Sequence, residues 1–178
     1  MRSNVALIGF MGTGKTAVGQ LLAKKLKMDF IEMDSLIASK AGKPIPQIFE
    51  DDGEIRFREL EIEIAKEVAR EERAVIACGG GVVLNWVNIE RLRESSIIVL
   101  LTASPSETLR RVSKEVGQRP LLKDVEPMTR IRELLKFRQP FYARAADIVV
   151  NTTRRAIQAA ADEIVTQLRE DARFDWPE

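Results

Sequence analysis

Several residue types that often carry chemistry are absent from this chain, or nearly so. It has no histidine, which excludes the most common general base, so a carboxylate or a lysine must take that role. Its single cysteine, Cys78, excludes an internal disulfide and is typical of a reducing compartment. Only 6% of the residues are aromatic, and neither Trp86 nor Trp176 lies in a recognisable motif. These residues give no guide to a function.

An excess of one charge is also lacking. The chain has 28 Lys+Arg against 27 Asp+Glu, a formal net charge of +1, and so predicts neither a nucleic-acid nor a membrane partner. No apolar run approaches membrane-spanning length, and the first expected strand begins too close to Met1 for a signal peptide. We therefore expect a cytoplasmic protein. A hydrophobic content of 45% over 178 residues is enough for one globular domain with a buried core.

What the chain does contain is a complete phosphate-binding pattern at residues 9–16, Gly-Phe-Met-Gly-Thr-Gly-Lys-Thr, which matches G-x-x-x-x-G-K-[ST]. An apolar run at 4–8 precedes it and a helical pattern at 17–26 follows it. The motif therefore lies at a strand-to-helix turn, where backbone N–H groups and the positive helix end can hold an anion.

The same loop predicts which residues contact a nucleoside triphosphate and its Mg²⁺. The Lys15 ammonium reaches the outer phosphates, and the Thr16 hydroxyl is a ligand for Mg²⁺. The expected contacts to the nucleotide are Gly12, Thr13, Gly14, Lys15, Thr16 and Ala17.

Further apolar strands alternate with helical patterns along the chain. This alternation predicts an α/β fold, with a parallel sheet of about five strands flanked by helices on both faces. We expect one domain over 1–170 and a frayed tail over 171–178. The other expected strands are 29–34, 74–78, 97–101 and 147–150, and the expected helices are 35–42, a short one ending at 49, 54–70, 85–93, one starting at 104, 126–142 and 156–168.

Two acidic residues follow the second strand. The strands at 74–78 and 97–101 end without the acid that many phosphate-loop proteins use for Mg²⁺, which leaves Glu32 and Asp34. Alternation along a strand puts these two carboxylates on the same face. We expect one to serve the metal, through water, and the other the acceptor.

Glycines and arginines supply the remaining candidates. Gly79-Gly80-Gly81 after a strand either lets a ligand approach bare backbone or simply forms a turn, and both interpretations stay open. Arg58, Arg119 and Arg138 carry no signal by spacing alone, because most arginines are merely solvated. Arg119 stands out because it lies in an expected loop at 117–125, where a lid would carry it onto phosphates.

The motifs together resemble those of the shikimate kinases, bacterial enzymes of aromatic amino-acid biosynthesis, over about residues 4–155. A phosphate loop alone is shared by many activities, but this ordered combination is specific. It consists of residues 9–16, Phe30–Asp34, Ile48–Glu50, Gly53-Glu54, Phe57-Arg58, Cys78–Val83, Arg119–Leu122, Arg138–Tyr142 and Ala146-Asp147.

The resemblance implies ATP-dependent phosphorylation of the 3-hydroxyl of shikimate, giving shikimate 3-phosphate and ADP. It implies a monomer with a nucleoside-monophosphate-kinase-like fold, a substrate-binding insertion near 33–60 and a lid near 112–124. Catalysis would fall to Lys15, Asp34 and Arg119, with Asp34 acting as base or orienter. The substrate contacts would be Asp34, Arg58, Gly80, Gly81 and Arg138.

The chain departs from the family pattern at one position and leaves another open. Glu32 stands where the family usually has aspartate, and with Thr16 it is the expected metal-binding pair. The adenine contacts come from Arg110 or Arg111 and from Arg154 or Arg155, and the resemblance does not choose within the pairs. Arg111, Arg119, Arg154 and Arg155 are the arginines we expect to contact the nucleotide.

Three alternatives are weighed against this prediction. One is another small-molecule kinase of the gluconate type, whose pattern around the second strand is not found. Another is a nucleotide-dependent switch, but the N-K-x-D and D-x-x-G motifs of guanine-specific switches are absent. The third is a degenerate paralogue that binds shikimate poorly, which only Glu32 supports.

Overall fold

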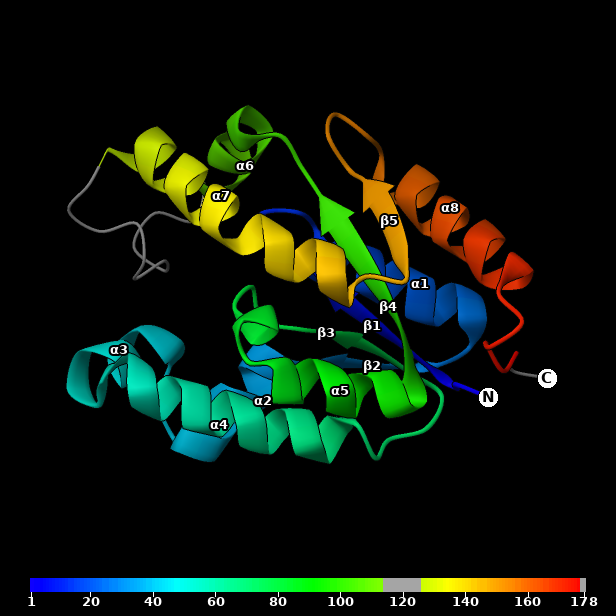
Figure 1. Ribbon diagram of the computed structural model, residues 1–178, viewed down its shortest axis with the longest axis horizontal. Helices are drawn as coiled ribbons and strands as arrows, with labels where there is room; N and C mark the ends of the chain where they lie inside the picture. The colour runs from blue at the N-terminus through cyan, green and yellow to red at the C-terminus, as the bar shows by residue number, and fades with distance from the viewer. Residues whose placement is uncertain (114–125, 177–178) are drawn as a thin grey trace.

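Short apolar strands pair into one parallel sheet with the order β2-β3-β1-β4-β5 (Figure 1). The computed structural model describes residues 1–113 and 126–176. The five parallel strands flanked by helices confirm the predicted α/β fold. The strands are β1 Asn4–Ile8, β2 Asp29–Glu32, β3 Ala74–Ala77, β4 Ser96–Thr102 and β5 Ile148–Asn151.

The central strand β1 is apolar throughout because both of its faces are covered. Val5 and Leu7 point into one hydrophobic core, and Ala6 and Ile8 point into the other. All four side chains are fully buried. The sheet thus separates two apolar layers and holds its strand ends in fixed positions.

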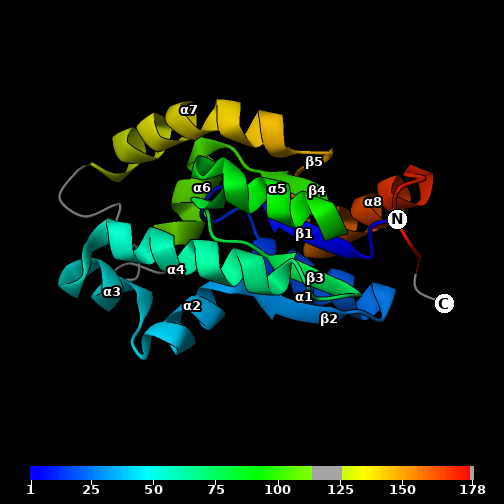
Figure 2. The ribbon, with the colours of Figure 1, turned by 60° about the horizontal axis from the view of Figure 1, so that its bottom comes forward.

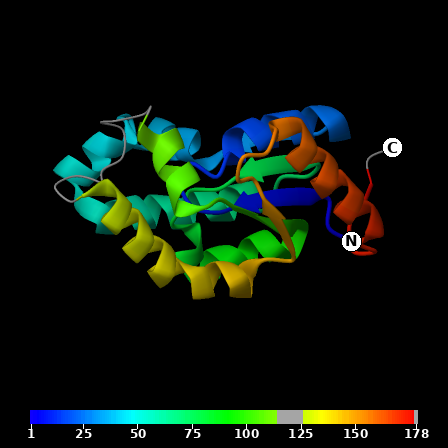
Figure 3. The same ribbon diagram turned by 90° about the horizontal axis from the view of Figure 1, so that it is seen from above.

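Helices cover the two faces in separate groups (Figure 3). α1 and α8 pack on the face of Val5 and Leu7, and α4, α5 and α7 on the opposite face. No helix in the described ranges is long and apolar enough to cross a membrane. The helices are α1 Lys15–Leu26, α2 Met33–Ala41, α3 Ile45–Asp51, α4 Gly53–Val68, η1 Val82–Leu84, α5 Trp86–Ser95, α6 Pro105–Val112, α7 Pro127–Ala145 and α8 Ile157–Glu170.

The carboxyl ends of the strands open between two helical groups. Figure 2 shows α7 on one side of this end of the sheet and α2, α3 and α4 on the other. Ligands of open parallel sheets bind at this end, so these helices are placed to form the walls of a site.

One predicted strand ends earlier than expected. The strand expected at 29–34 stops at Glu32, and Asp34 lies in the first turn of α2. The pairing partner explains the difference, because β3 ends at Ala77, opposite Glu32, and leaves later residues without a ladder. Glu32 and Asp34 therefore do not share a strand face, and the argument from alternation is wrong.

The prediction of a frayed tail is also wrong for residues 171–176. Phe174 is buried and forms a bridge with Arg2. The backbone N–H of Arg2 donates to Arg173 O at 2.7 Å, and that of Asp175 donates to Arg2 O at 2.9 Å. These hydrogen bonds hold residues 173–175 beside the start of β1. The buried Phe174 ring adds apolar contact, which composition alone does not reveal. Residues 177–178 lie outside the described ranges.

Candidate active site

The phosphate-binding loop follows β1, and its backbone is wrapped as the motif predicts. Lys15 Nζ donates to the carbonyl oxygens of Gly9 and Phe10 at 2.9 and 3.0 Å, and Thr13 Oγ1 donates to Phe10 O at 2.8 Å. Gly9 has φ 145°, and a Cβ there would lie 2.3 Å from Leu101 O. Only glycine fits this position, because the loop passes directly over the end of β4.

A small cavity lies between the loop and the end of β2. It has a volume of about 230 Å³ and is lined by Lys15, Thr16, Glu32 and Asp34, among others. Thr16 Oγ1 donates to Glu32 Oε1 at 2.5 Å. Cys78 also lines it, but burial raises the pKa of this thiol, so Cys78 is a packing residue rather than a nucleophile.

The hydroxyl and carboxylate in this cavity fit a magnesium ion that keeps much of its water. The described residues contain no group of three or more His, Cys, Asp or Glu that could form a complete metal cage. Mg²⁺ does not require one, because it is usually held by one or two protein oxygens together with phosphate oxygens and water. Thr16 and Glu32 present such oxygens side by side.

On the other side of the loop lies a second cavity of about 390 Å³. Arg111 is fixed there: its Nη1 donates to Gly12 O at 2.9 Å, and its Nη2 donates to Thr152 O at 2.7 Å. Arg155 lines this cavity, whereas Arg154 lines a separate hollow with Ser104 and Arg110. The structure therefore brings Arg111 and Arg155 to the loop and keeps Arg154 away from it.

Glu107 anchors this arginine corner from α6. Its carboxylate accepts from Arg110 Nη2 at 2.7 Å and from Arg111 Nε at 2.8 Å. The hydrogen bonds from Arg110 and then Arg111 lower the pKa of Glu107 to about 2. The carboxylate therefore stays charged and holds both guanidinium groups on α6.

A large cavity of about 510 Å³ lies between α7 and the α2–α4 group. It shares Met11 and Asp34 with the small phosphate-side cavity, and that cavity shares Gly12 and Gly14 with the one beside Arg111. The three hollows therefore adjoin one another around the phosphate loop, and together they are called the channel. The residues that line the large cavity are Met11, Asp34, Ser35, Ala38, Pro44, Ile45, Pro46, Phe49, Phe57, Arg58, Gly79, Gly80, Gly81 and Arg138.

Arg138 brings a buried positive charge to the large cavity. Its exposed fraction is 4%, and its Nη1 donates to Gly80 O at 3.1 Å. Its Nε is buried without a hydrogen-bond partner, and no carboxylate of the described residues forms an ion pair with it. A buried guanidinium in this state is stabilised by any anion that enters the cavity.

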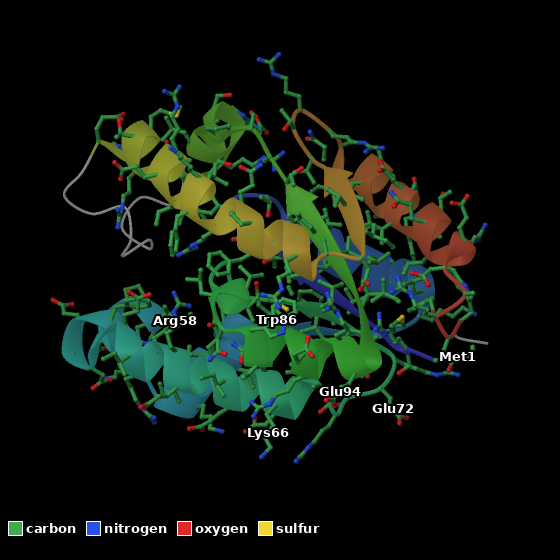
Figure 4. The ribbon with its side chains drawn as sticks, in the orientation of Figure 1. Met1, Arg58, Lys66, Glu72, Trp86 and Glu94 are labelled. Atoms are coloured by element: carbon green, nitrogen blue, oxygen red, sulfur yellow. The ribbon has the colours of Figure 1, made fainter. Side chains whose placement is uncertain are left out.

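Arg58 reaches the same cavity from α4 but is already paired. Its Nη1 lies 3.1 Å from Glu61 Oε2, and its Nη2 lies 2.9 Å from Glu54 Oε1. Figure 4 shows Arg58 on the side of α4 that faces α7. Glu61 is fully buried, and burial raises its pKa although the Arg58 charge opposes the shift. The Glu61 carboxyl thus holds Arg58 against the cavity wall.

The glycine turn after β3 makes room for two acids. An ideal Cβ on Gly79 would lie 2.9 Å from Asp34 Oδ1 and 3.0 Å from Glu61 Oε1. A Cβ on Gly81 would lie 2.3 Å from Arg58 Nη1. None of the three glycines has a positive φ, so the turn does not need glycine for its backbone conformation. Gly79 and Gly81 are instead required where side chains from α2 and α4 approach closely.

Sequence reasoning missed three residues that support this site. Glu61 holds Arg58, Tyr142 holds the Gly80 carbonyl, and Thr152 holds Arg111. Glu61 and Tyr142 follow their arginines by three and four positions on one helix, a spacing that marks neighbouring side chains. Thr152 has no such signal, because its partners are far away in the chain. Arg119 and most of the expected lid at 112–124 lie outside the described residues.

Comparisons with known proteins identify the family. A family model described as shikimate kinase matches residues 11–169. The shikimate kinase of Caldanaerobacter subterraneus subsp. tengcongensis is 46% identical over 162 residues, which cover 91% of this chain and 94% of that protein. The chain belongs to the shikimate kinase family. The predicted resemblance is thereby confirmed, and membership implies a nucleotide substrate and a small-molecule acceptor.

Solved structures agree with membership of the shikimate kinase family. The shikimate kinase from Acinetobacter baumannii, solved in complex with shikimate, superposes with a TM-score of 0.92 at 34% identity, covering 97% of this chain and 96% of that one. A gluconokinase from Sinorhizobium meliloti, with a TM-score of 0.61, 21% identity and coverage of 96% of this chain and 94% of that one, shares the fold alone. The family's motifs thus lie on the fold that positions the channel described above.

Proposed function

We propose that this chain transfers the γ-phosphoryl group of ATP to the 3-hydroxyl of shikimate, forming shikimate 3-phosphate and ADP. The observation that carries the proposal is the buried Arg138, which lines a cavity next to the one at the phosphate-binding loop. A small acceptor with a carboxylate supplies the anion that this guanidinium requires. The relative from Acinetobacter baumannii was solved with such an acid, shikimate.

Arg58 and Arg138 bind the acceptor carboxylate in this proposal. The planar guanidinium fork suits a carboxylate because it offers two parallel N–H donors. Arg58 already shares its charge with Glu54 and Glu61, so Arg138 supplies the larger part of the attraction. The backbone of Gly80 and Gly81, which lines the cavity between the insertion at 33–60 and α7, lies against the acceptor ring.

Asp34 receives the proton of the reacting hydroxyl. It lines both the acceptor cavity and the phosphate-side cavity, which is where the two substrates must meet. The 3-hydroxyl oxygen forms a bond to the γ-phosphorus while the bond between that phosphorus and ADP breaks. Phosphoryl transfer depends mainly on alignment and charge neutralisation, so a carboxylate suffices in a chain without histidine.

The phosphate loop binds the ATP phosphates through the backbone of residues 12–17 and through Lys15. Thr16 and Glu32 are the residues that would hold Mg²⁺, which would neutralise charge on the outer phosphates. Glutamate in place of the family's usual aspartate is one methylene longer, and its contact with the Thr16 hydroxyl supports a shared role for the pair.

The adenine side is assigned to Arg111 and Arg155. Support comes from the cavity beside the loop, which Arg155 lines and Arg154 does not. Arg110 and Arg111 both line it, but Arg111 is the one hydrogen-bonded to the loop, at Gly12 O. Hydrogen bonds along the edge of the Arg111 guanidinium leave its planar face for stacking. Arg119, assigned by resemblance alone, neutralises the transferring phosphoryl group.

We propose that the enzyme works as a monomer in the cytoplasm.

The test is ADP release with ATP and Mg²⁺ in the presence of shikimate, gluconate, AMP or no acceptor. Release that depends on shikimate alone, together with shikimate 3-phosphate by mass spectrometry, supports the proposal. Release driven by gluconate would show that the chain is a kinase for a different acceptor, and it would contradict the roles of Arg58 and Arg138. ATP binding without release in any arm would favour a switch or a degenerate paralogue.

A further inference from the structure

Tyr142, the chain's single tyrosine, shares a hydrogen-bond acceptor with Arg138. The two residues lie one turn apart on α7, and both are buried. The Tyr142 hydroxyl donates to Gly80 O at 2.5 Å, and Arg138 Nη1 donates to the same oxygen at 3.1 Å. One backbone carbonyl of the glycine turn therefore holds both side chains.

This shared carbonyl restricts how the Arg138 guanidinium can lie. A carbonyl oxygen has two lone pairs, so the phenol and the guanidinium occupy both. Because the guanidinium is planar and rigid, anchoring one N–H of a group already tethered by its own side chain restricts the directions open to the other four. Arg138 has no carboxylate partner among the described residues, so the Gly80 carbonyl, together with the Phe10 ring 5.7 Å from its Cζ, holds the guanidinium in place.

The phenol is suited to a permanent donor role. Burial raises the pKa of Tyr142 to about 12, although the nearby Arg138 charge opposes the shift. The hydroxyl therefore keeps its proton throughout the neutral range and can donate it to the Gly80 carbonyl at every pH at which the enzyme would be assayed.

We propose that Tyr142 is a positioning residue that sets the Arg138 guanidinium plane, through the shared Gly80 carbonyl, for the carboxylate of the acceptor. The inference rests on the proposed function, because it requires an acceptor carboxylate at Arg138. Without the hydroxyl, Arg138 can rotate towards the free lone pair of Gly80 O, and its remaining N–H groups no longer point as a pair into the cavity.

The experiment compares wild type and Tyr142→Phe on shikimate and on its methyl ester, which lacks the carboxylate charge. Loss of one buried hydrogen bond corresponds to about a fivefold effect, so we expect the preference in kcat/KM for shikimate over the ester to fall about fivefold. The KM for ATP should not change. Phe141→Leu, which alters the neighbouring half-exposed side chain of α7, is the matched control and should keep the wild-type preference.

Failure of this inference is distinct from failure of the proposed function. Wild type that does not phosphorylate shikimate would remove the proposed function, and this inference with it. Wild type that works while Tyr142→Phe keeps its preference, or loses activity equally on both acceptors, would overturn the positioning role alone. An equal rise in the KM for ATP would overturn it as well, because it would show a general structural loss.

A second measurement does not need the variant to fold. Biosynthetic incorporation of 3-fluorotyrosine labels only position 142, since the chain has one tyrosine. We expect the fluorine resonance to shift when shikimate binds and to stay in place with the methyl ester at saturation. Equal shifts with both acceptors, or no shift with either, would overturn the coupling between Tyr142 and the carboxylate-binding guanidinium.

Discussion

Arg111 Nη1 lies 2.9 Å from the carbonyl oxygen of Gly12, so the last turn of α6 is tied to the phosphate-binding loop. Thr152 completes the connection from the other side of the sheet. Its hydroxyl donates to Thr13 O at 2.9 Å and accepts from Arg111 Nη1 at 3.1 Å. The geometry of the loop therefore depends on a buried network that reaches β5.

This network predicts the effect of Thr152→Val, which keeps the side-chain volume and removes the hydroxyl. Buried carbonyls left without their donor cost about 1–3 kcal/mol each, so the loop should relax and the KM for ATP should rise about fivefold or more. The KM for shikimate should not change. Steady-state kinetics with each substrate varied in turn measure both, and Thr166→Val on the exposed face of α8 is the control. An unchanged KM for ATP would separate Thr152 from nucleotide binding.

Asp34→Asn tests the proton acceptor. The amide is nearly isosteric but cannot take the hydroxyl proton, so kcat should fall by about 10²–10⁴-fold, the usual range for a general base. The affinity for ATP should stay within about twofold, since Asp34 makes no proposed contact with the nucleotide. Stopped assays give kcat, and calorimetric titration with a non-hydrolysable ATP analogue gives the affinity. Turnover at the wild-type rate would remove Asp34 from the mechanism.

Arg138→Lys tests the carboxylate grip. Lysine keeps the charge but loses the bidentate fork, so the KM for shikimate should rise about tenfold, equivalent to about 1.4 kcal/mol. The exposed Arg132→Lys, earlier on the same helix, makes the same chemical change away from the cavity and should behave as wild type. The role would be contradicted by a KM for shikimate that matches this control.

Gly79→Ala tests the close approach of two carboxylates. The added methyl would lie 2.9 Å from Asp34 Oδ1 and 3.0 Å from Glu61 Oε1, so both side chains must move. Because overpacking typically costs about 1–3 kcal/mol, the melting temperature should drop by several degrees and kcat should fall with it. Gly80→Ala is the comparison for stability, since its nearest contact would be 3.6 Å. Equal melting temperatures for the two variants would contradict the crowding at Gly79.

We expect Asp171→Asn to lower the free energy of unfolding by an amount that depends on pH. The Arg173 side chain lowers the pKa of Asp171 to about 2, below its unfolded value of about 3.9. A carboxyl whose pKa is lower in the folded chain than in the unfolded chain stabilises the fold at pH values above its pKa in the unfolded chain. This contribution is lost as the pH falls through its pKa in the folded chain. The variant should thus be less stable than wild type at pH 7, and the difference should vanish near pH 2. Denaturant unfolding at several pH values measures this, with the exposed Glu170→Gln as control; a difference that is constant with pH would contradict it.

The fold was predictable because its signals are local. Apolar runs such as Ile97–Leu101 mark buried strands, and Ser104 with Pro105 marks a helix start that the structure confirms through the hydrogen bond from Glu107 N to Ser104 Oγ. Position 34 was misread as a strand residue because the end of β2 depends on where β3 stops, which is information from a different segment.

The site was predictable only where a motif or a family pattern names a residue. Arg154 and Arg155 are indistinguishable in sequence, but in the structure they line different hollows, and Arg154 has a left-handed backbone with φ 51°. Glu61 and Tyr142 hold the two arginines that are proposed to bind the substrate, but neither Glu61 nor Tyr142 belongs to a known chemical motif. Their roles depend on packing between α4, α7 and the glycine turn, and such contacts are set by the tertiary structure.

The bridge between Arg2 and Phe174 brings both described ends of the chain together at the amino ends of the strands, opposite the channel. A linker joined to either end would therefore leave the side of the molecule that takes up ATP and the acceptor facing outward. The protein is suited to attachment on a sensor surface, or to fusion with another enzyme, in a defined orientation that keeps its substrates free to enter.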